Sequence, residues 1–343
     1  MLNDERQSPL SAIAAASSTS VGALELSVPS GRLDRAIDLL LTHAGPLRIQ
    51  NALIHRIFER AGLEERFLSL RNGRVHAWIA PELSDAKRED RRPPLLLLHG
   101  FGADAQLQWF RQIAPLSARY RLIVPDLLYF GRSEAARLDP HLNFQVEALI
   151  ELLDLLGIER AHVLGISYGG LCAMELASSF DERVDRLIIS NSPGPIMTPA
   201  DHAALIDRLK VGEIADLLIP RDPSEMDRLL RVAWHRPSPI PGFAKRDAFN
   251  RYFRDRAEER RAVMRALISR IGEPGLLDRR ISHDSLILWG EHDPVFPVEM
   301  AHRLRAFIGQ RAALRVFKRT AHAPNQERPR DYNRVVLSFL EER

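Results

Sequence analysis

The stretch GISYGG, residues 165–170, constrains the fold more than any other part of this 343-residue chain. It places Ser167 between glycines two positions away on each side, directly after a short run of branched apolar residues. A strand that ends in a tight turn before a helix needs small residues at Gly165 and Gly169, because side chains there would collide with the backbone of the turn. The pattern therefore predicts a strand, a sharp turn and a helix, with the hydroxyl of Ser167 exposed at the turn.

Short apolar runs alternate with helical patterns along most of the chain. The runs typical of buried strands lie at 95–98, 122–124, 162–165, 187–189, 286–288 and 314–317. The helical patterns lie around 105–117, 143–157, 168–180, 297–308 and 329–341. Asn72-Gly73 stands between two β-rich runs from Phe67 onward and indicates a hairpin before the first of these runs. The alternation predicts an α/β fold, with a mostly parallel eight-stranded sheet and helices on both faces.

One segment, residues 195–282, breaks this alternation. It contains no strand-like run and shows a helical pattern interrupted by prolines. A stretch of this length is not a plain loop in a compact domain, so we predict a helical cap inserted after the sixth strand. The chain then divides into an N-terminal extension at 1–65, disordered at its start and then helical, a core at 66–194, the cap at 195–282, and the rest of the core at 283–343.

The extension carries two helical patterns, at 33–44 and at 49–61. Their apolar faces are compatible with packing on the core, with a homodimer contact or with peripheral contact to a membrane surface. The cap is a further candidate for membrane contact.

Composition excludes several classes of protein. The values of 45% hydrophobic and 27% charged residues are those of an ordinary globular chain. A formal net charge of +3, with no block of like charges, gives no support for a nucleic-acid partner. No apolar run approaches the roughly 20 residues of a transmembrane helix, and Asp4 and Glu5 are untypical of a secretory signal. We expect a cytoplasmic location, with peripheral membrane contact as the alternative, and a structural role for the single Cys172.

Polar segments follow the predicted strands, at the sheet edge where reactive groups of such folds gather. They read HGFGAD at 99–104, PDLLYFGRS at 125–133, GISYGG at 165–170, WGEHDPVFP at 289–297 and TAHAPNQERP at 320–329. In this order the motifs resemble the α/β-hydrolase superfamily, and the resemblance covers residues from about 67 to 343. Within it the chain looks most similar to cap-bearing serine esterases and monoacylglycerol lipases, and to hydrolases that cleave carbon–carbon bonds in ring-cleavage products.

The resemblance implies a catalytic triad of Ser167 as nucleophile, His322 as base and Asp293 as acid. A serine hydroxyl is a weak nucleophile, so an imidazole must take its proton and a carboxylate must orient that imidazole. The resemblance also implies an oxyanion hole formed by the backbone N–H groups of Phe101 and Tyr168.

The loop at 99–104 carries supporting residues. In the family, the histidine at the position of His99 holds this loop, and Gly100 and Gly102 let it approach the substrate. His283 precedes the seventh strand and is expected at the surface. Of the candidate histidines, only His322 follows the last strand. Asp126 and Arg132 on the next loop are interpreted as a loop-stabilising pair, with a pocket wall as the alternative.

Competing assignments surround the acid. Glu291 and His292 precede Asp293 and raise the alternative of a metal site, but neither a second cluster nor a helical ligand spacing accompanies them. Asn191 stands where some relatives carry the acid, and an amide cannot carry the charge. We predict no metal and no cofactor, because side chains and water suffice for the reaction.

Three functions remain open on these residues. The first is hydrolysis of a small-molecule carboxylic ester, medium-chain or monoacylglycerol-like. The second uses the same triad to cleave a carbon–carbon bond in a dienoate-type ketone, which requires an arginine directed at the substrate carboxylate. The third is a small-molecule receptor built on the same fold.

Overall fold

The structure of the protein, a computed structural model, describes residues 47–81, 91–102, 104–273 and 280–342. All described residues belong to one compact unit, which lies within Leu40–Arg343. The helical pattern at 33–44 therefore lies outside the described residues. The pattern at 49–61 coincides with helix α2 (Leu47–Arg60).

The described strands form a mixed, mostly parallel sheet in the order β1-β2-β4-β3-β6-β7-β8-β9. These strands are β1 (Glu64–Leu70), β2 (Gly73–Ile79), β3 (Pro94–Leu98), β4 (Arg121–Pro125), β6 (Ala161–Ile166), β7 (Val184–Ser190), β8 (Ser285–Gly290) and β9 (Ala312–Phe317). The two-residue β5 (Glu134–Ala135) pairs with β2 beside this path. The β1–β2 hairpin and the β2–β4 pair are antiparallel, and every pair from β4 to β9 is parallel. The predicted fold class is confirmed.

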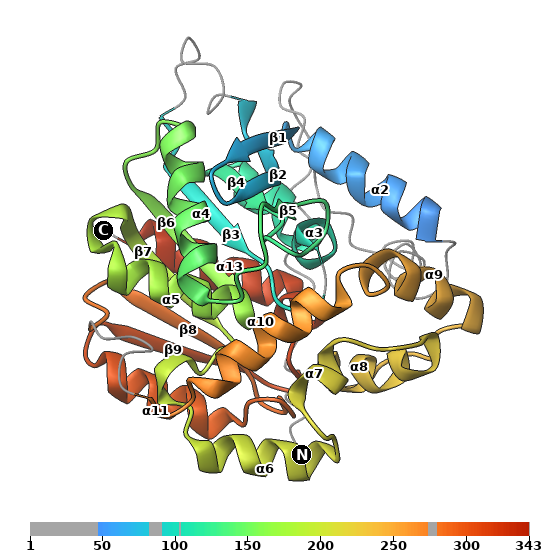
Figure 1. Cartoon of the computed structure of the whole chain (residues 1–343). Helices are drawn as coiled ribbons and strands as arrows, with labels where there is room; N and C mark the ends of the chain where they lie inside the picture. Colours follow the sequence, from blue (N-terminus) through green and yellow to red (C-terminus); the bar gives the residue numbers. More distant parts are fainter. Residues whose placement is uncertain (1–46, 82–90, 103, 274–279, 343) are drawn as a thin grey trace, which may run out of the picture. The chain divides into compact units, whose positions relative to one another are not determined.

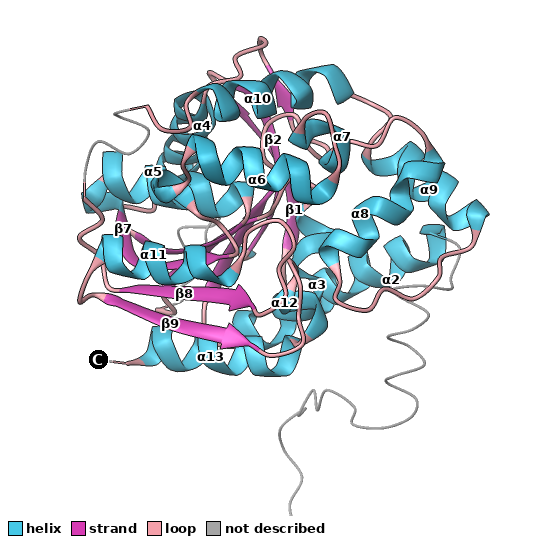
Figure 2. Cartoon of the chain, turned by 90° about the horizontal axis from the view of Figure 1, so that it is seen from below, coloured by secondary structure: helices cyan, strands magenta, loops and turns pink. Residues whose placement is uncertain are grey.

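Helices cover both faces of the sheet, as Figure 2 shows for α5 and α11 on one face and α3 and α13 on the other. These core helices are α3 (Ala105–Ser117), α4 (Leu142–Leu155), α5 (Tyr168–Ser179), α11 (Val298–Ile308), α12 (Pro324–Glu327) and α13 (Pro329–Glu341). Short 3₁₀ helices lie at Asp181–Arg183, Gly194–Ile196 and Pro223–Glu225. The predicted ranges 105–117 and 329–341 coincide with α3 and α13, and the other three differ from the observed bounds by at most two residues at either end.

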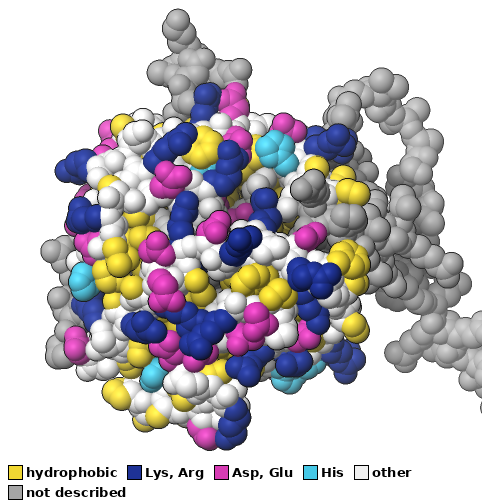
Figure 3. Space-filling view, turned by 45° about the vertical axis from the view of Figure 1, so that its right-hand side comes forward, with side chains coloured by type: hydrophobic (Ala, Val, Ile, Leu, Met, Phe, Trp, Pro, Cys, Tyr) yellow, Lys and Arg dark blue, Asp and Glu magenta, His cyan; other side chains and the backbone are white. Residues whose placement is uncertain are grey.

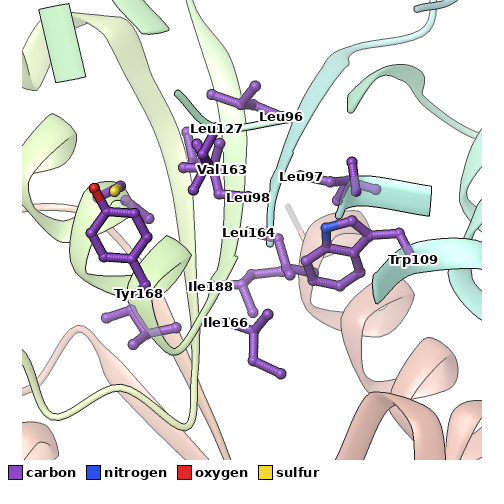
Figure 4. Close-up of a cluster of buried hydrophobic side chains, with 14 of the residues drawn as sticks. Leu96, Leu97, Leu98, Trp109, Leu127, Val163, Leu164, Ile166, Tyr168 and Ile188 are labelled. Atoms are coloured by element: carbon purple, nitrogen blue, oxygen red, sulfur yellow. The ribbon is translucent and has the colours of Figure 1, made fainter. Parts of the chain in front are cut away.

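The centre of the sheet is buried on both faces. All four leucines of the run 95–98 are fully buried, which explains why β3 is continuously apolar instead of alternating. Trp109 and Tyr168 lie on opposite sides of this cluster, so α3 and α5 each contribute a large ring to it (Figure 4). This packing fixes the carboxyl ends of β3 and β6, where the candidate site lies.

The cap, residues 195–282, connects β7 to β8 (Figure 1, yellow to orange). Its helices are α6 (Pro199–Leu209), α7 (Ile214–Leu218), α8 (Met226–Ala233), α9 (Gly242–Tyr252) and α10 (Ala257–Ser269). Its described residues contain no strand, in agreement with the sequence pattern. Across the described ranges, every helix is too short or too polar to cross a bilayer.

Candidate active site

Ser167 occupies the turn between β6 and α5 with an unusual backbone conformation, φ 54° and ψ −118°. A residue with a Cβ adopts a positive φ only at a cost, and such strain persists where the surrounding structure enforces it. Here the N–H of Ser167 donates to the Ser190 carbonyl at 2.9 Å, and its carbonyl accepts from the Leu171 N–H at 3.1 Å. The turn is thus held by β7 and by the first turn of α5.

The two glycines around Ser167 have no space for a side chain. A Cβ on Gly165 would lie 2.1 Å from the carbonyl oxygen of Gly169, and a Cβ on Gly169 would lie 2.2 Å from that of Leu98. Both distances are far below van der Waals contact. The close approach of β6, α5 and β3 at this point therefore depends on glycine at both positions.

Asp293 follows β8, and its side chain is fully buried. Its Oδ2 lies 2.8 Å from His322 Nδ1 and accepts a 2.8 Å hydrogen bond from Asn191 Nδ2. Its Oδ1 accepts from the N–H groups of Val295 at 2.8 Å and Phe296 at 3.0 Å. These partners satisfy a carboxylate whose burial would otherwise be costly.

His322 follows β9 and reaches the same cavity as Ser167. Because its Nδ1 contacts the Asp293 carboxylate, its Nε2 remains as the nitrogen that can accept a proton from a serine. Between Ser167 and His322, both described residues, the structure shows no hydrogen bond within 3.5 Å. Catalytic hydrogen bonds of this kind are often long before substrate binds and tighten in the complex.

His99 holds the loop after β3 and does not line the cavity. Its Nδ1 lies 2.7 Å from the Gly100 carbonyl, and its Nε2 accepts from the Leu127 N–H at 2.9 Å. Complete burial lowers the pKa of His99, so the ring is neutral and Nδ1 donates. A Cβ on Gly100 would lie 3.3 Å from the Cβ of Ser167, whereas one on Gly102 would meet only Leu229 of the cap, at 3.8 Å.

The backbone N–H groups of Phe101 and Tyr168 belong to the two segments that meet at Ser167. Tyr168 is the first residue of α5, so its N–H lies among those that have no partner inside the helix. The rings of Phe101 and Tyr168 pack edge to face with centroids 5.4 Å apart, and Phe101 packs likewise on Phe130 at 4.9 Å. These contacts fix the two segments relative to each other.

A cavity of about 190 Å³ joins Ser167 and His322 to the cap. From the core it is lined by Gly100, Phe101, Gly102, Leu107, Gln108, Phe110 and Ile166, and from the cap by Leu218, Met226, Leu229, Leu230, Val232, Trp234, Ile240, Ala244, Lys245, Ala248, Tyr252 and Phe253. Most of this lining is apolar. Two nearby aromatic residues do not line the cavity: Trp109 is buried in the core, and Phe243 is 49% exposed.

One cation, Lys245, contributes to the described lining of this cavity. Its Nζ donates to Asp227 Oδ2 at 2.6 Å, so its charge is already paired by a residue of the cap. The described residues that line the cavity include no arginine. The described lining is thus mostly apolar, with Lys245 as its one cation.

A half-buried carboxylate, Glu327, joins the cap to the loop that carries His322. It accepts the N–H of Ala321 at 2.6 Å and, across the joint, the N–H of His235 at 2.9 Å. Burial raises the pKa of Glu327. The Ala323 N–H also donates to the Ala233 carbonyl at 3.0 Å, which adds a second bond across the joint. The sequence analysis missed this joint, because nothing local marks Glu327.

The structure adds to or corrects three further sequence interpretations. Asn191, excluded as the acid because an amide carries no charge, donates to Asp293, a contact between residues 102 positions apart. His283 is buried, with Nε2 3.0 Å from the Asp181 carbonyl, so the expectation that it lies at the surface is wrong. Asp126 accepts the backbone N–H of Arg132 at 2.9 Å, while the guanidinium of Arg132 pairs with Glu65.

No group of three or more metal-ligating side chains occurs among the residues that the structure describes. His292, proposed above as part of an alternative metal site, stacks on the ring of His235 with centroids 4.6 Å apart. The carboxylate of Glu291 accepts the backbone N–H of Arg319 at 3.0 Å.

The sheet order, the turn at Ser167 and the Asp293–His322 pair are the features of one fold family. The chain belongs to the α/β-hydrolase fold family, whose profile matches residues 93–329. It is an α/β-fold hydrolase, with distant relatives among esterases, lipases and carbon–carbon bond hydrolases.

Individual relatives are distant. An uncharacterized protein of Mycobacterium tuberculosis is 28% identical, with 73% of this chain and 75% of the relative covered. A 2-hydroxy-6-oxo-6-phenylhexa-2,4-dienoate hydrolase of Comamonas testosteroni is 26% identical over 73% of this chain and 88% of its own. Among solved structures, a membrane phospholipase A described as a bacterial virulence factor superposes with a TM-score of 0.73 and 25% identity, covering 90% of this chain and 95% of its own.

Proposed function

We propose that the protein is a serine hydrolase that cleaves carboxylic esters with apolar acyl groups, medium-chain or monoacylglycerol-like, through an acyl-enzyme. The observation that carries the proposal is the apolar cavity that contains both Ser167 and His322. Among the described residues that line it, Lys245 is the one cation, and this cation is paired with Asp227. Such a cavity favours an uncharged, apolar acyl group at the point where a nucleophile is available.

In the first half of the reaction, Ser167 Oγ attacks the ester carbonyl carbon while His322 Nε2 takes the hydroxyl proton. The 2.8 Å contact between His322 Nδ1 and Asp293 supports the tautomer with Nδ1–H and stabilises the imidazolium that forms. The N–H groups of Phe101 and Tyr168 would bind the oxyanion, each worth roughly 3 kcal/mol of transition-state stabilisation. The imidazolium then donates its proton to the leaving alcohol.

In the second half, His322 takes a proton from water, and the resulting hydroxide attacks the acyl carbon on Ser167. The tetrahedral species collapses, Ser167 regains its proton from His322, and the carboxylic acid leaves. All protons are exchanged between the substrate, water, Ser167 and His322, so no metal or cofactor enters this scheme.

A second candidate is hydrolysis of a carbon–carbon bond in a dienoate-type ketone. The relative from Comamonas testosteroni bears the name of such a hydrolase, which is the observation in favour. A dienoate carries a carboxylate, and its recognition calls for a cation that is free to bind it. The paired Lys245 does not meet this requirement, so the ester substrate is the better fit.

The test is a panel that contains p-nitrophenyl esters graded from acetate to laurate and a dienoate ketone. Wild type should hydrolyse the esters, with kcat/KM highest for medium-length acyl chains. Ser167→Ala should lower kcat/KM by at least about a thousandfold, while Ser69→Ala on exposed β1 should leave it unchanged. Turnover of the dienoate above that of every ester would overturn the ester assignment, and undiminished turnover in Ser167→Ala would overturn the nucleophile.

A further inference from the structure

Two exposed apolar side chains stand next to residues that line the cavity. Ile49 on α2 is 52% exposed and precedes the lining residue Gln50. Phe243 on α9 is 49% exposed and precedes the lining residue Ala244. Single exposed apolar side chains are common on proteins, so these two carry weight only together with the exposed cations around them.

The helices α2 and α9, which carry these side chains, lie side by side in both ribbon views (Figures 1 and 2). The hydroxyl of Tyr252 at the end of α9 donates to Asn51 Oδ1 on α2 at 3.2 Å. This bond ties the end of α9 to α2.

Helical spacing places a basic residue on the same outward side of each helix. On α2 the exposed residues Ile49, Ala52 and Arg56 follow the i, i+3, i+7 spacing of one face. On α9 the exposed residues Phe243, Arg246 and Asn250 follow the same spacing. We call these six residues the α2–α9 face.

The cap around this face is strongly basic. Between residues 226 and 254 the chain has seven Lys and Arg against two Asp and Glu. The exposed cations are Arg228, Arg231, Arg236, Arg246, Arg251 and Arg254, whereas one acid of this stretch, Asp247, is equally exposed. Figure 3 brings the side of α8 and α9 toward the viewer and shows Lys and Arg side chains interspersed with apolar side chains and with Asp and Glu.

We propose that the α2–α9 face docks the protein reversibly on an anionic lipid bilayer. Phe243 and Ile49 insert between the headgroups, and the surrounding arginines contact lipid phosphates. The arginine excess argues against a second copy of the chain on this face, because a two-fold contact would bring the same arginines together. The docking does not depend on Ser167. We further infer that the bilayer supplies the ester that enters the cavity, and this second step rests on the proposed function.

The experiment measures binding of the full chain, as the Ser167→Ala variant, to vesicles by sedimentation. The vesicles are phosphatidylethanolamine with phosphatidylglycerol, compared with pure phosphatidylcholine. We expect binding to the anionic vesicles to exceed binding to the neutral ones by at least about tenfold and to fall as salt is raised. Phe243→Ser and Arg246→Glu should each lower the partition coefficient by about tenfold.

Matched controls are Phe307→Ser on α11, where the side chain is 44% exposed, and Arg315→Glu on β9, whose arginine is also exposed. Both should bind vesicles as the parent does, and thermal unfolding should show that all four variants are folded. Absence of binding to anionic vesicles, or equal binding by the Phe243 and Arg246 variants and the parent, would overturn the proposal.

Two outcomes separate this inference from the proposed function. Vesicle binding by the α2–α9 face in a protein that hydrolyses no ester would leave the docking intact and refute the function. Alternatively, light scattering could show a dimer of the parent that Phe243→Ser abolishes, while the parent binds no vesicles. That result would assign the face to a second copy of the chain and overturn the docking.

Discussion

The core edge around Ser167 and the cap beside it differ in how closely the backbone packs. At the core edge, backbone meets backbone so closely that Gly165 and Gly169 have no room for a methyl group. The cap joins the core through apolar side chains such as Leu205 of the shared hydrophobic cluster, and through polar contacts such as Glu327 to the His235 N–H. Backbone packed this closely leaves one arrangement, whereas side chains and a few hydrogen bonds can adjust.

Burial follows the same division. Every residue of β6 is buried, whereas α9 buries only Ala244 and Tyr252 among its eleven residues. Under the proposed function, the core positions Ser167 and His322, and the cap, which supplies much of the cavity lining, selects the molecule that enters. Substitutions in the two regions should therefore differ in kind, and the following variants are chosen to break or sharpen that contrast.

The largest effect is expected from a methyl group at the core turn. Gly169→Ala places a Cβ 2.2 Å from the Leu98 carbonyl oxygen and must move β3 or α5, so it should cost more than about 3 kcal/mol of unfolding free energy. Gly242→Ala in the cap meets no atom within 4 Å and should change stability by less than about 0.5 kcal/mol. Urea denaturation of both variants checks the contrast, and equal losses would refute it.

Two buried or paired carboxylates should respond to pH with opposite signs. Burial raises the pKa of Asp104, at the start of α3, from 3.8 to about 6. The stabilising contribution of this carboxyl group is therefore complete below pH 3.8 and is lost as the pH rises through 6. Asp104→Asn, which retains an acceptor for the Leu107 N–H, should therefore gain about 2 kcal/mol of stability between pH 4 and pH 7.5 relative to wild type.

In the cap, hydrogen bonds from Arg303 lower the pKa of Asp201 to about 2. Its contribution is present above pH 3.8 and is lost as pH falls through 2, so Asp201→Asn should lose about 1 kcal/mol at pH 7. Chemical denaturation at the two pH values measures both variants. A stability gain by Asp201→Asn, or a loss by Asp104→Asn at pH 7.5, would contradict these signs.

A modest effect, on the rate and not on stability, is expected from Asn191, whose amide contacts Asp293. Asn191→Ala removes the 2.8 Å hydrogen bond to Asp293 Oδ2 and should lower kcat about tenfold with little change in KM. Asn191→Asp places a second carboxylate beside the first and should shift the acidic limb of the pH–rate profile upward. Unaltered pH–rate profiles in both variants would show that Asn191 has a structural role only.

Much of the core could be predicted from the sequence because its signals are local. The run Leu95–Leu98 is continuously apolar since β3 is buried on both faces, and Gly165 avoids a backbone collision with Gly169, four residues further along the same turn. The chain position of Asp293 and His322 after successive strands places both at one sheet edge.

The rest depends on contacts between distant segments. Asn191 could be excluded as an acid from its chemistry, but its donation to Asp293 depends on the neighbouring positions of β7 and β8 in the sheet. His283 is polar and precedes a strand, yet the carbonyl of Asp181 meets it in the interior.

In the cap, nothing in the sequence distinguishes Phe253, which lines the cavity, from Phe243, which is exposed. Both are aromatic residues on or next to one helix, and only the docking of that helix on the core separates them. Long-range polar contacts and the orientation of the cap therefore could not be predicted from local sequence patterns.

The most direct test of the account is covalent labelling with a fluorophosphonate, followed by mass spectrometry of the peptides. The account predicts one label per chain, on Ser167, that is abolished in Ser167→Ala and slowed at least about a hundredfold in His322→Ala. A chain that remains unlabelled while folded, or that carries the label on a different serine, would contradict the assignment of Ser167 as an activated nucleophile.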